Sequence, residues 1–269
     1  MNATIDIPQG GAWFEGHFPG RPILPGVAEL ALAVEALARN AGHPVSLRGI
    51  AFARLRQVVL PGDRLDMSSR ELDSGRLRIE LKRKGDLVAN AEFLLGNPEE
   101  AHGVAAVCGA AGHAESPFPA LDALLPHREP MRFLTSILSV TADGLACTAR
   151  IPDACALVTD GQAPPVAAIE AAAQAAAAWE AVRRSRETGL ASPRIGYLVA
   201  LRDIIFFTGS VPAERDLLVS IRLEGAAPPL THYGIEVSLN GKPVTRGTIA
   251  TFLAPSPRPS PLQSGGGGD

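Results

Sequence analysis

A histidine on a stiff turn just ahead of a helix is the first feature of the sequence that suits catalysis. His17 lies in segment 16–27, where prolines fix the backbone dihedral φ and glycines permit close backbone approach. The apolar run 27–38 predicts a helix whose free N–H groups lie beside this turn. An imidazole at such a helix end suits removal of a proton next to a carbonyl group that the helix polarises. The alternative is a tight turn with a buried, hydrogen-bonded histidine.

A carboxylic acid on an alanine-rich helix is the second such feature. Glu170 and Gln174 stand four residues apart in the apolar segment 166–178, so they share one face of the predicted helix. The segment is apolar enough that both helix faces are expected to be buried. A buried carboxylate needs a partner or a raised pKa, and a raised pKa is what we expect of a general acid. The alternatives are an exposed charge for Glu170 and a core polar contact for Gln174.

Segment 16–27, with the sequence GHFPGRPILPGV, resembles the HFPGxPxxPGV motif of the 3-hydroxyacyl-[acyl-carrier-protein] dehydratases, which have the hotdog fold. Two further segments carry this resemblance, LLPHREPM at 124–131 and PPVAAIEAAAQ at 164–174. In the family the LLPHR segment is structural, so His127 is expected to pack or hydrogen-bond rather than to act as the base. The resemblance implies no metal and no cofactor, since the substrate is carried on the phosphopantetheine of an acyl carrier protein.

The resemblance also implies a site split between two halves of the chain. In the family an acid follows the histidine by fourteen residues, but position 31 here is Ala. Fourteen residues before Glu170, position 156 is also Ala. Homodimeric members take the histidine of each site from one protomer and the acid from the other. We therefore expect one complete site, His17 with Glu170, and one dead site, Ala31 with Ala156.

Two other carboxylates on the first helix are expected to lie outside the site. At 100° per residue, Glu29 faces away from position 31, and Glu35 lies one turn too deep.

The implied reaction is dehydration of a 3-hydroxyacyl thioester to a trans-2-enoyl thioester. His17 removes the C2 proton, Glu170 protonates the departing hydroxyl group, and Gln174 orients Glu170 or a water. Backbone N–H groups at a helix start polarise the thioester carbonyl. The candidates for these donors are Gly26, Val27 and Val166. The proline at position 165 replaces a family glycine and has no N–H, so that half must use Val166 if it supplies the donor.

One order of elements occurs twice. The 269 residues exceed one small domain and suit two of about 125 each. A helix (27–40, then 166–186) is followed each time by alternating segments with hairpin turns. We predict an α+β fold, a tandem double hotdog forming a pseudo-dimer within one chain. Its expected parts are an N-terminal hotdog with His17 (1–97), a linker (98–119), a C-terminal hotdog with Glu170 (120–254) and a disordered tail (255–269).

The composition is that of a globular protein, with 46% hydrophobic and 20% charged residues. A formal net charge of −3 gives no general attraction to nucleic acid or anionic lipid. No apolar run reaches the roughly 20 residues of a membrane span, and the N-terminus lacks a signal-peptide pattern. Cys108, Cys147 and Cys155 are scattered without a CxxC pair. They indicate reduced thiols in a cytoplasmic protein and neither zinc nor disulfides.

An acidic carrier protein would require a basic rim around the site. The candidates are Arg54, Arg56, Arg132, Arg202 and residues 82–84, each of which is alternatively an ordinary solvated charge. Association of two pseudo-dimers into a further homodimer is left open.

A half with the histidine joined to a half with the acid resembles the paired dehydratase subunits of aryl polyene (xanthomonadin-type) pigment pathways, fused in one chain. Two other functions stay open. A hotdog acyl thioesterase would use an acid on the helix but does not explain the HFPG turn. A non-catalytic acyl-binding or scaffold subunit is favoured if Ala31 and Pro165 mean loss of function.

Overall fold

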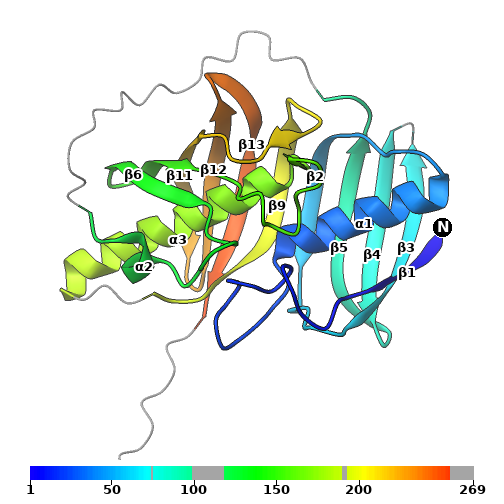
Figure 1. Cartoon of the computed structure of the whole chain (residues 1–269), viewed down its shortest axis with the longest axis horizontal. Coiled ribbons are helices and arrows are strands. Elements are labelled where there is room, and N and C mark those ends of the chain that lie inside the picture. The colour runs from blue at the N-terminus through cyan, green and yellow to red at the C-terminus, as the bar shows by residue number, and fades with distance from the viewer. Residues whose placement is uncertain (74, 99–117, 190–192, 255–269) are drawn as a thin grey trace, which may run out of the picture.

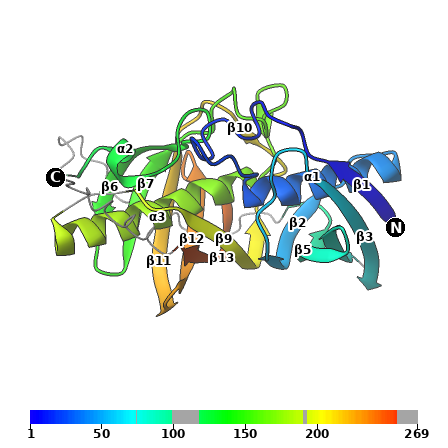
Figure 2. The same ribbon diagram turned by 90° about the horizontal axis from the view of Figure 1, so that it is seen from below.

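One antiparallel sheet of eleven strands carries the fold in this computed structural model, which describes residues 1–73, 75–98, 118–189 and 193–254. The strand order is β1-β3-β4-β5-β2-β9-β13-β12-β11-β7-β6. Two long helices, α1 (Gly26–Ala41) and α3 (Ala167–Thr188), lie end to end on one face of the sheet, one over each half (Figure 1). Figure 2 shows the same two helices on one side of the sheet when it is viewed from below. The predicted tandem double hotdog is confirmed.

Each half contributes its own strands to this sheet. The strands of the N-terminal half are β1 (Asn2–Asp6), β2 (Leu47–Leu55), β3 (Arg64–Asp73), β4 (Arg76–Arg83) and β5 (Asp86–Leu95). Those of the C-terminal half are β6 (Leu134–Val140), β7 (Gly144–Ala149), β9 (Gly196–Phe206), β11 (Leu217–Ala227), β12 (Leu230–Leu239) and β13 (Lys242–Leu253). A short helix, α2 (Leu121–Leu124), and a small pair, β8 (Gln162–Ala163) with β10 (Val211–Pro212), complete the described elements.

The two helices begin and end where their sequences indicate. Pro25 precedes α1, and Gly42 ends it in the left-handed conformation at φ 74°. Gly189 ends α3 in the same way at φ 71°. Both helices are buried against the sheet on most of their surface, because the sheet covers one side and loops cover the other (Figure 2). Residues 57–60 form a loop that leads into the next turn.

The seam between the halves is a pair of equivalent strands. β2 is the first strand after α1, and β9 is the first strand after α3. They pair antiparallel, with Gly49 opposite Ile205 and Ile50 opposite Ile204. Equivalent elements that meet in this way form the symmetric contact expected within a dimer, here inside one chain. The starts of both helices consequently face each other at the centre of the molecule (Figure 1).

The predicted linker and tail fall almost wholly outside the described residues, as does Cys108. The domain boundaries therefore stay predictions. Cys147 and Cys155 are buried free thiols. Among the helices within the described ranges, we find none with the length and apolar character needed to cross a membrane.

A test of the seam uses Gly49, which is buried in β2. A Cβ atom there would lie 2.2 Å from the carbonyl oxygen of Ile204 in β9, so Gly49→Val must push the paired strands apart. We expect the free energy of unfolding to fall by about 1–3 kcal/mol, as in other overpacked sites. The measurement is urea unfolding followed by circular dichroism. Gly10→Val is the control, because Gly10 is exposed and has no neighbour within 4 Å of an added Cβ. Equal stability of Gly49→Val and the unmodified protein would contradict this seam.

Candidate active site

A cavity of about 420 Å³ at the seam contains groups from both halves. The N-terminal half contributes His17 and Gly26, and the C-terminal half contributes His127 and Glu170. His17 and Glu170 are only 7% and 4% exposed, and a ring nitrogen of His17 lies within 4.8 Å of a carboxylate oxygen of Glu170. The structure thus brings together the predicted pair, at a spacing that proton transfer through one water can bridge. The alternative of an exposed charge is wrong for Glu170.

His17 is held as a proton acceptor. Its Nδ1 lies 3.0 Å from the carbonyl oxygen of Ile23. A carbonyl oxygen only accepts hydrogen bonds, so Nδ1 carries the hydrogen and Nε2 keeps its lone pair. Burial lowers the pKa of His17 to about 4, and the negative charge of Glu170 opposes this only in part. At neutral pH His17 is therefore an uncharged imidazole, the form that a general base requires.

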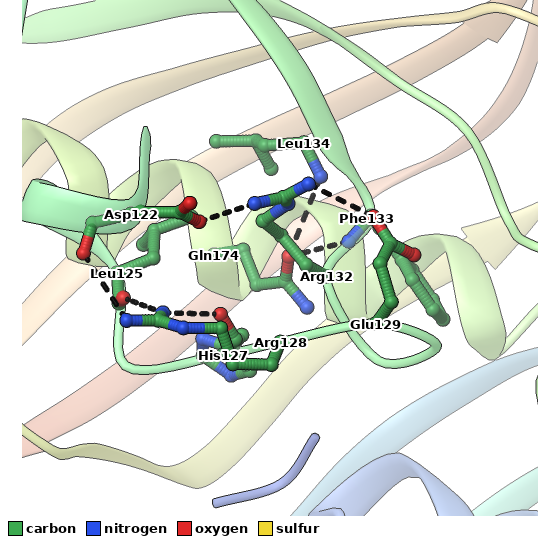
Figure 3. A network of polar contacts seen from close by, with 9 residues as sticks. All are labelled: Asp122, Leu125, His127, Arg128, Glu129, Arg132, Phe133, Leu134 and Gln174. Carbon is green, nitrogen blue, oxygen red and sulfur yellow. Dashed lines mark hydrogen bonds and ion pairs between the residues drawn. The ribbon is translucent and has the colours of Figure 1, made fainter. Parts of the chain in front are cut away.

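Glu170 is oriented by Gln174, one turn further along α3. The Gln174 amide nitrogen donates to Glu170 Oε1 at 3.0 Å and to the carbonyl oxygen of Met131 at 2.7 Å. The Gln174 amide oxygen accepts a hydrogen bond from the backbone N–H of Phe133 at 2.8 Å (Figure 3). These partners fix which end of the amide faces Glu170. The expected contact between the two side chains is present.

The carboxyl group of Glu170 is an ionised acid, contrary to the raised pKa expected of a general acid. Burial alone would raise its pKa, but the hydrogen bond from His127, the charges of His127 and His17, and the amide of Gln174 lower it to about 2. The expectation of a raised pKa was wrong. The other possibility, a buried carboxylate with partners, is what the structure contains.

His127 belongs to the same cluster. Its Nε2 lies 3.4 Å from Glu170 Oε1, and its ring centroid lies 5.3 Å from that of His17. The side chain is buried, and its Nδ1 has no hydrogen-bond partner among the described residues. The prediction that His127 would pack or hydrogen-bond is confirmed, but its position inside the site was missed. A signal was available, because His127, like His17, has a proline within two residues.

The segment that carries His127 is tied to the His17 turn. The backbone N–H of Arg128 donates to the carbonyl oxygen of Gly16 at 3.0 Å. A Cβ atom on Gly16 would lie 1.9 Å from the Arg128 carbonyl oxygen, and Gly16 has φ +78°, so only glycine fits this approach. The guanidinium group of Arg128 binds the carbonyl oxygens of Leu125 and His127 (Figure 3). The two histidine-bearing segments are therefore positioned as one unit.

Of the three predicted carbonyl-polarising donors, Gly26 is the one that the cavity reaches. It is the first residue of α1, where N–H groups have no acceptor within the helix. Val27 and Val166 are buried and are not among the described residues that line the cavity. This geometry favours the donor from the N-terminal half, where the absence of an N–H at Pro165 does not matter. The role of all three residues stays a prediction.

Glu29 lines the same cavity, so the expectation that it faces away was wrong. The comparison with position 31 misled, because the acid of this site comes from the other half and Ala31 does not line the cavity among the described residues. Glu29 instead shares a helix face with Gly26, three residues earlier. Its side chain is buried, its Oε2 has no partner among the described groups, and burial raises its pKa well above the ordinary value.

The predicted basic rim is only partly right. Arg56 lines the cavity. Arg54 and Arg202 line a separate cavity on the sheet, and Arg132 is paired with Asp122 and Glu129 (Figure 3). Within 82–84, Lys82 is paired with Glu80 of its own strand, and Arg83 is paired with Asp63 just before β3. Arg184 and Arg194, which were not predicted from the sequence, also line the cavity at the seam.

The donor atoms of His17, His127 and Glu170 all lie within 4.8 Å of one another. That spacing would admit a divalent cation. The hydrogen bonds to Ile23 and Gln174 already orient the cluster for acid–base chemistry, and we assign no metal to it.

Comparison with known proteins identifies the family of the chain. The family model for the ApeP dehydratase matches residues 119–260, and that for the ApeI dehydratase matches residues 1–92. The chain belongs to the ApeP dehydratase family. Its two matches in tandem make it a hotdog dehydratase fusion of the ApeI and ApeP type, as the sequence resemblance implied.

Two curated relatives are similar to part of the chain, and one solved structure shares its fold. The chain is 39% identical over 106 residues to the 3-hydroxyacyl-[acyl-carrier-protein] dehydratase FabZ of Agrobacterium fabrum (strain C58), covering 34% of this chain and 64% of that relative. It is 41% identical over 78 residues to FabZ of Chloroflexus aggregans, covering 26% of this chain and 47% of that one. The chain thus spans about half to two thirds of these relatives. The dehydratase domain of PpsC from Mycobacterium tuberculosis, solved with C12:1-CoA, shares the fold at TM-score 0.67 and 14% identity, over 94% of this chain and 93% of that one.

The buried acid Glu29 gives a stability test with a defined sign. Its raised pKa means that folding takes up a proton wherever the unfolded carboxyl is already ionised, so the native state loses stability as pH rises above about 4.5. Glu29→Gln removes this loss. We expect the variant to gain stability relative to the unmodified protein, and to gain more at pH 8 than at pH 5, in urea unfolding. Glu35→Gln is the matched control, since Glu35 is exposed on the same helix. A gain that is the same at both pH values would show that Glu29 is ionised in the folded protein.

Proposed function

We propose that the chain dehydrates 3-hydroxyacyl thioesters, carried on an acyl carrier protein, to trans-2-enoyl thioesters at this one composite site. The observation that carries the proposal is a neutral imidazole from one half and an ionised carboxylate from the other, both buried in one cavity. The FabZ relatives are named as 3-hydroxyacyl-[acyl-carrier-protein] dehydratases, which favours the same substrate class here.

The proposed chemistry begins with His17. Its Nε2 removes a proton from C2 of the substrate, while the N–H of Gly26 at the start of α1 stabilises the negative charge that develops on the thioester oxygen. The electrons of the broken C–H bond form the C2–C3 double bond. The C3 hydroxyl group leaves from the Glu170 side of the cavity, takes up a proton there and departs as water.

The rest of the cavity suits an acyl chain and its carrier. Small and apolar side chains, Ala173, Ala177 and Leu198, form part of its wall. Three cations, Arg56, Arg184 and Arg194, also line it, and they suit the phosphate of a phosphopantetheine arm and an acidic carrier protein. The ApeI and ApeP matches favour a role in aryl polyene synthesis. The buried free thiols of Cys147 and Cys155 favour a reducing compartment, which we propose is the cytoplasm.

The test is a single-turnover assay with a 3-hydroxyacyl-carrier-protein and the variants His17→Ala and Glu170→Gln. Each should lose at least about 10²-fold in the rate of enoyl formation, the usual contribution of a general base or acid. Circular dichroism and thermal melting check that both variants fold. Glu35→Gln, an exposed change on α1, should keep full activity.

The products decide between this proposal and its alternatives. Enoyl thioester is the expected product. Release of the free acid would identify a thioesterase, and binding without turnover would identify a scaffold subunit. Enoyl formation that persists in Glu170→Gln would overturn the composite site.

A further inference from the structure

The proposed dehydration leaves one proton without a source. The departing hydroxyl group must take up a proton, yet the pKa of Glu170 is about 2, so this carboxylate has no proton to give near neutral pH. A second group on the acid side of the cavity must therefore carry it. This step rests on the proposed function.

His127 is placed to be that group. It lines the cavity together with Glu170 and His17, and it is 6% exposed. Its Nε2 lies 3.4 Å from Glu170 Oε1, while its other nitrogen, Nδ1, is buried without a partner among the described residues. Gln174 also donates to Glu170 Oε1, so neither donor occupies Oε2. A buried histidine with one nitrogen on a carboxylate and the other unpaired has an open position for a ligand atom.

We infer that His127 carries the proton that leaves with the hydroxyl group, as the acid member of an imidazolium–carboxylate pair with Glu170. The Glu170 oxygen beside His127 Nε2 can accept a hydrogen bond, and a histidine can carry a proton on either ring nitrogen. His17 does not compete for this role, because burial keeps it neutral.

Arg128 and Cys155, which lie beside the pair, do not supply the proton. Glu29 lines the same cavity, but no contact among the described residues joins it to Glu170 or His127. The guanidinium group of Arg128 donates a hydrogen bond to the backbone carbonyl oxygen of His127. A guanidinium group does not give up its proton in proteins. Cys155 lies near Glu170, but burial raises the pKa of its thiol to about 11, so it is a poor acid at neutral pH. Among the described contacts, the side chains that face His127 are those of Glu170, His17 and Phe18.

The step balances with these groups alone. The C2–H bond breaks and its proton goes to His17 Nε2, while its electron pair forms the C2–C3 double bond. The C3–O bond breaks with its electron pair on oxygen, which takes the proton from the His127–Glu170 pair and leaves as water. His17 ends protonated and the pair ends without its proton. Transfer of one proton from His17 to the pair through water restores both.

A structural role for His127 can be distinguished from a proton-carrying role by substitution with glutamine. A glutamine at position 127 can still donate a hydrogen bond to Glu170, but it cannot carry a proton between groups. The informative variant is therefore His127→Gln. His43→Gln is the matched control, because His43 is exposed in a loop after α1.

The experiment compares two substrates, a 3-hydroxyacyl thioester and the matching 3-chloroacyl thioester. Chloride leaves without taking up a proton, so its elimination needs the base but not the acid. We expect His127→Gln to lose about 10²–10⁴-fold with the 3-hydroxy substrate and less than about tenfold with the 3-chloro substrate. His17→Ala should lose activity with both, and His43→Gln with neither.

Equal losses on the two substrates, or full activity of His127→Gln with the 3-hydroxy substrate, would overturn the inference. If His127→Gln does not fold, Glu170→Gln disables the same pair from α3 and should give the same selective loss. A failure of the proposed function itself is separable, because the unmodified protein would then form no enoyl thioester from the 3-hydroxy substrate.

Discussion

The constraint behind this architecture is one negative charge buried at the seam of two half-proteins. Glu170 is 4% exposed, and an unpaired carboxylate at such a depth would cost several kcal/mol or become neutral. It stays ionised because three groups reach it: Gln174 from its own helix, His127 from the segment that precedes β6, and His17 from the other half of the chain. His17 and Gln174 are in turn held by backbone carbonyl or N–H groups, and the backbone of His127 is held by the guanidinium group of Arg128. The loops, the helix start and the sheet must all be in place for the charge to be stable.

Duplication explains how such a site arises with one base and one acid. The pairing of β2 with β9 makes the halves neighbours in a continuous sheet, and it brings the starts of α1 and α3 together (Figure 1). In a symmetric dimer this arrangement would create two equivalent sites. By the family spacing, alanines at 31 and 156 stand where the second pair would be, so we propose one acid–base pair in the chain rather than two.

The sequence was a good guide to whatever depends on local chemistry. The bounds of α1 and α3 follow from Pro25, Gly42 and Gly189 and were predicted to within two residues. The pairing of His17 with Glu170 followed from the spacing of a family motif applied to both halves. These features depend on residues that are close in the sequence, because turn residues and hydrophobic periodicity determine them.

What was missed depends on contacts between distant segments. His127 enters the site through the close approach of Gly16 to Arg128, which no local pattern encodes. Glu29 was placed by comparison with position 31 of its own helix, although both halves of the chain line the cavity. The direction of the Glu170 pKa shift was wrong because burial was counted and the two imidazoles were not. The balance between burial, which raises the pKa of a carboxyl group, and nearby imidazoles, which lower it, can be judged only once the positions of the groups are known.

The electrostatic coupling between His17 and Glu170 across the seam can be measured directly. ¹⁵N NMR of the His17 imidazole, recorded over a pH series in the unmodified protein and in Glu170→Gln, measures it without relying on turnover. We predict a ring that stays neutral down to about pH 4, with its hydrogen on Nδ1, and a titration midpoint that falls further once the charge of Glu170 is gone. A midpoint near the ordinary value of about 6.5 that does not change in Glu170→Gln would contradict it.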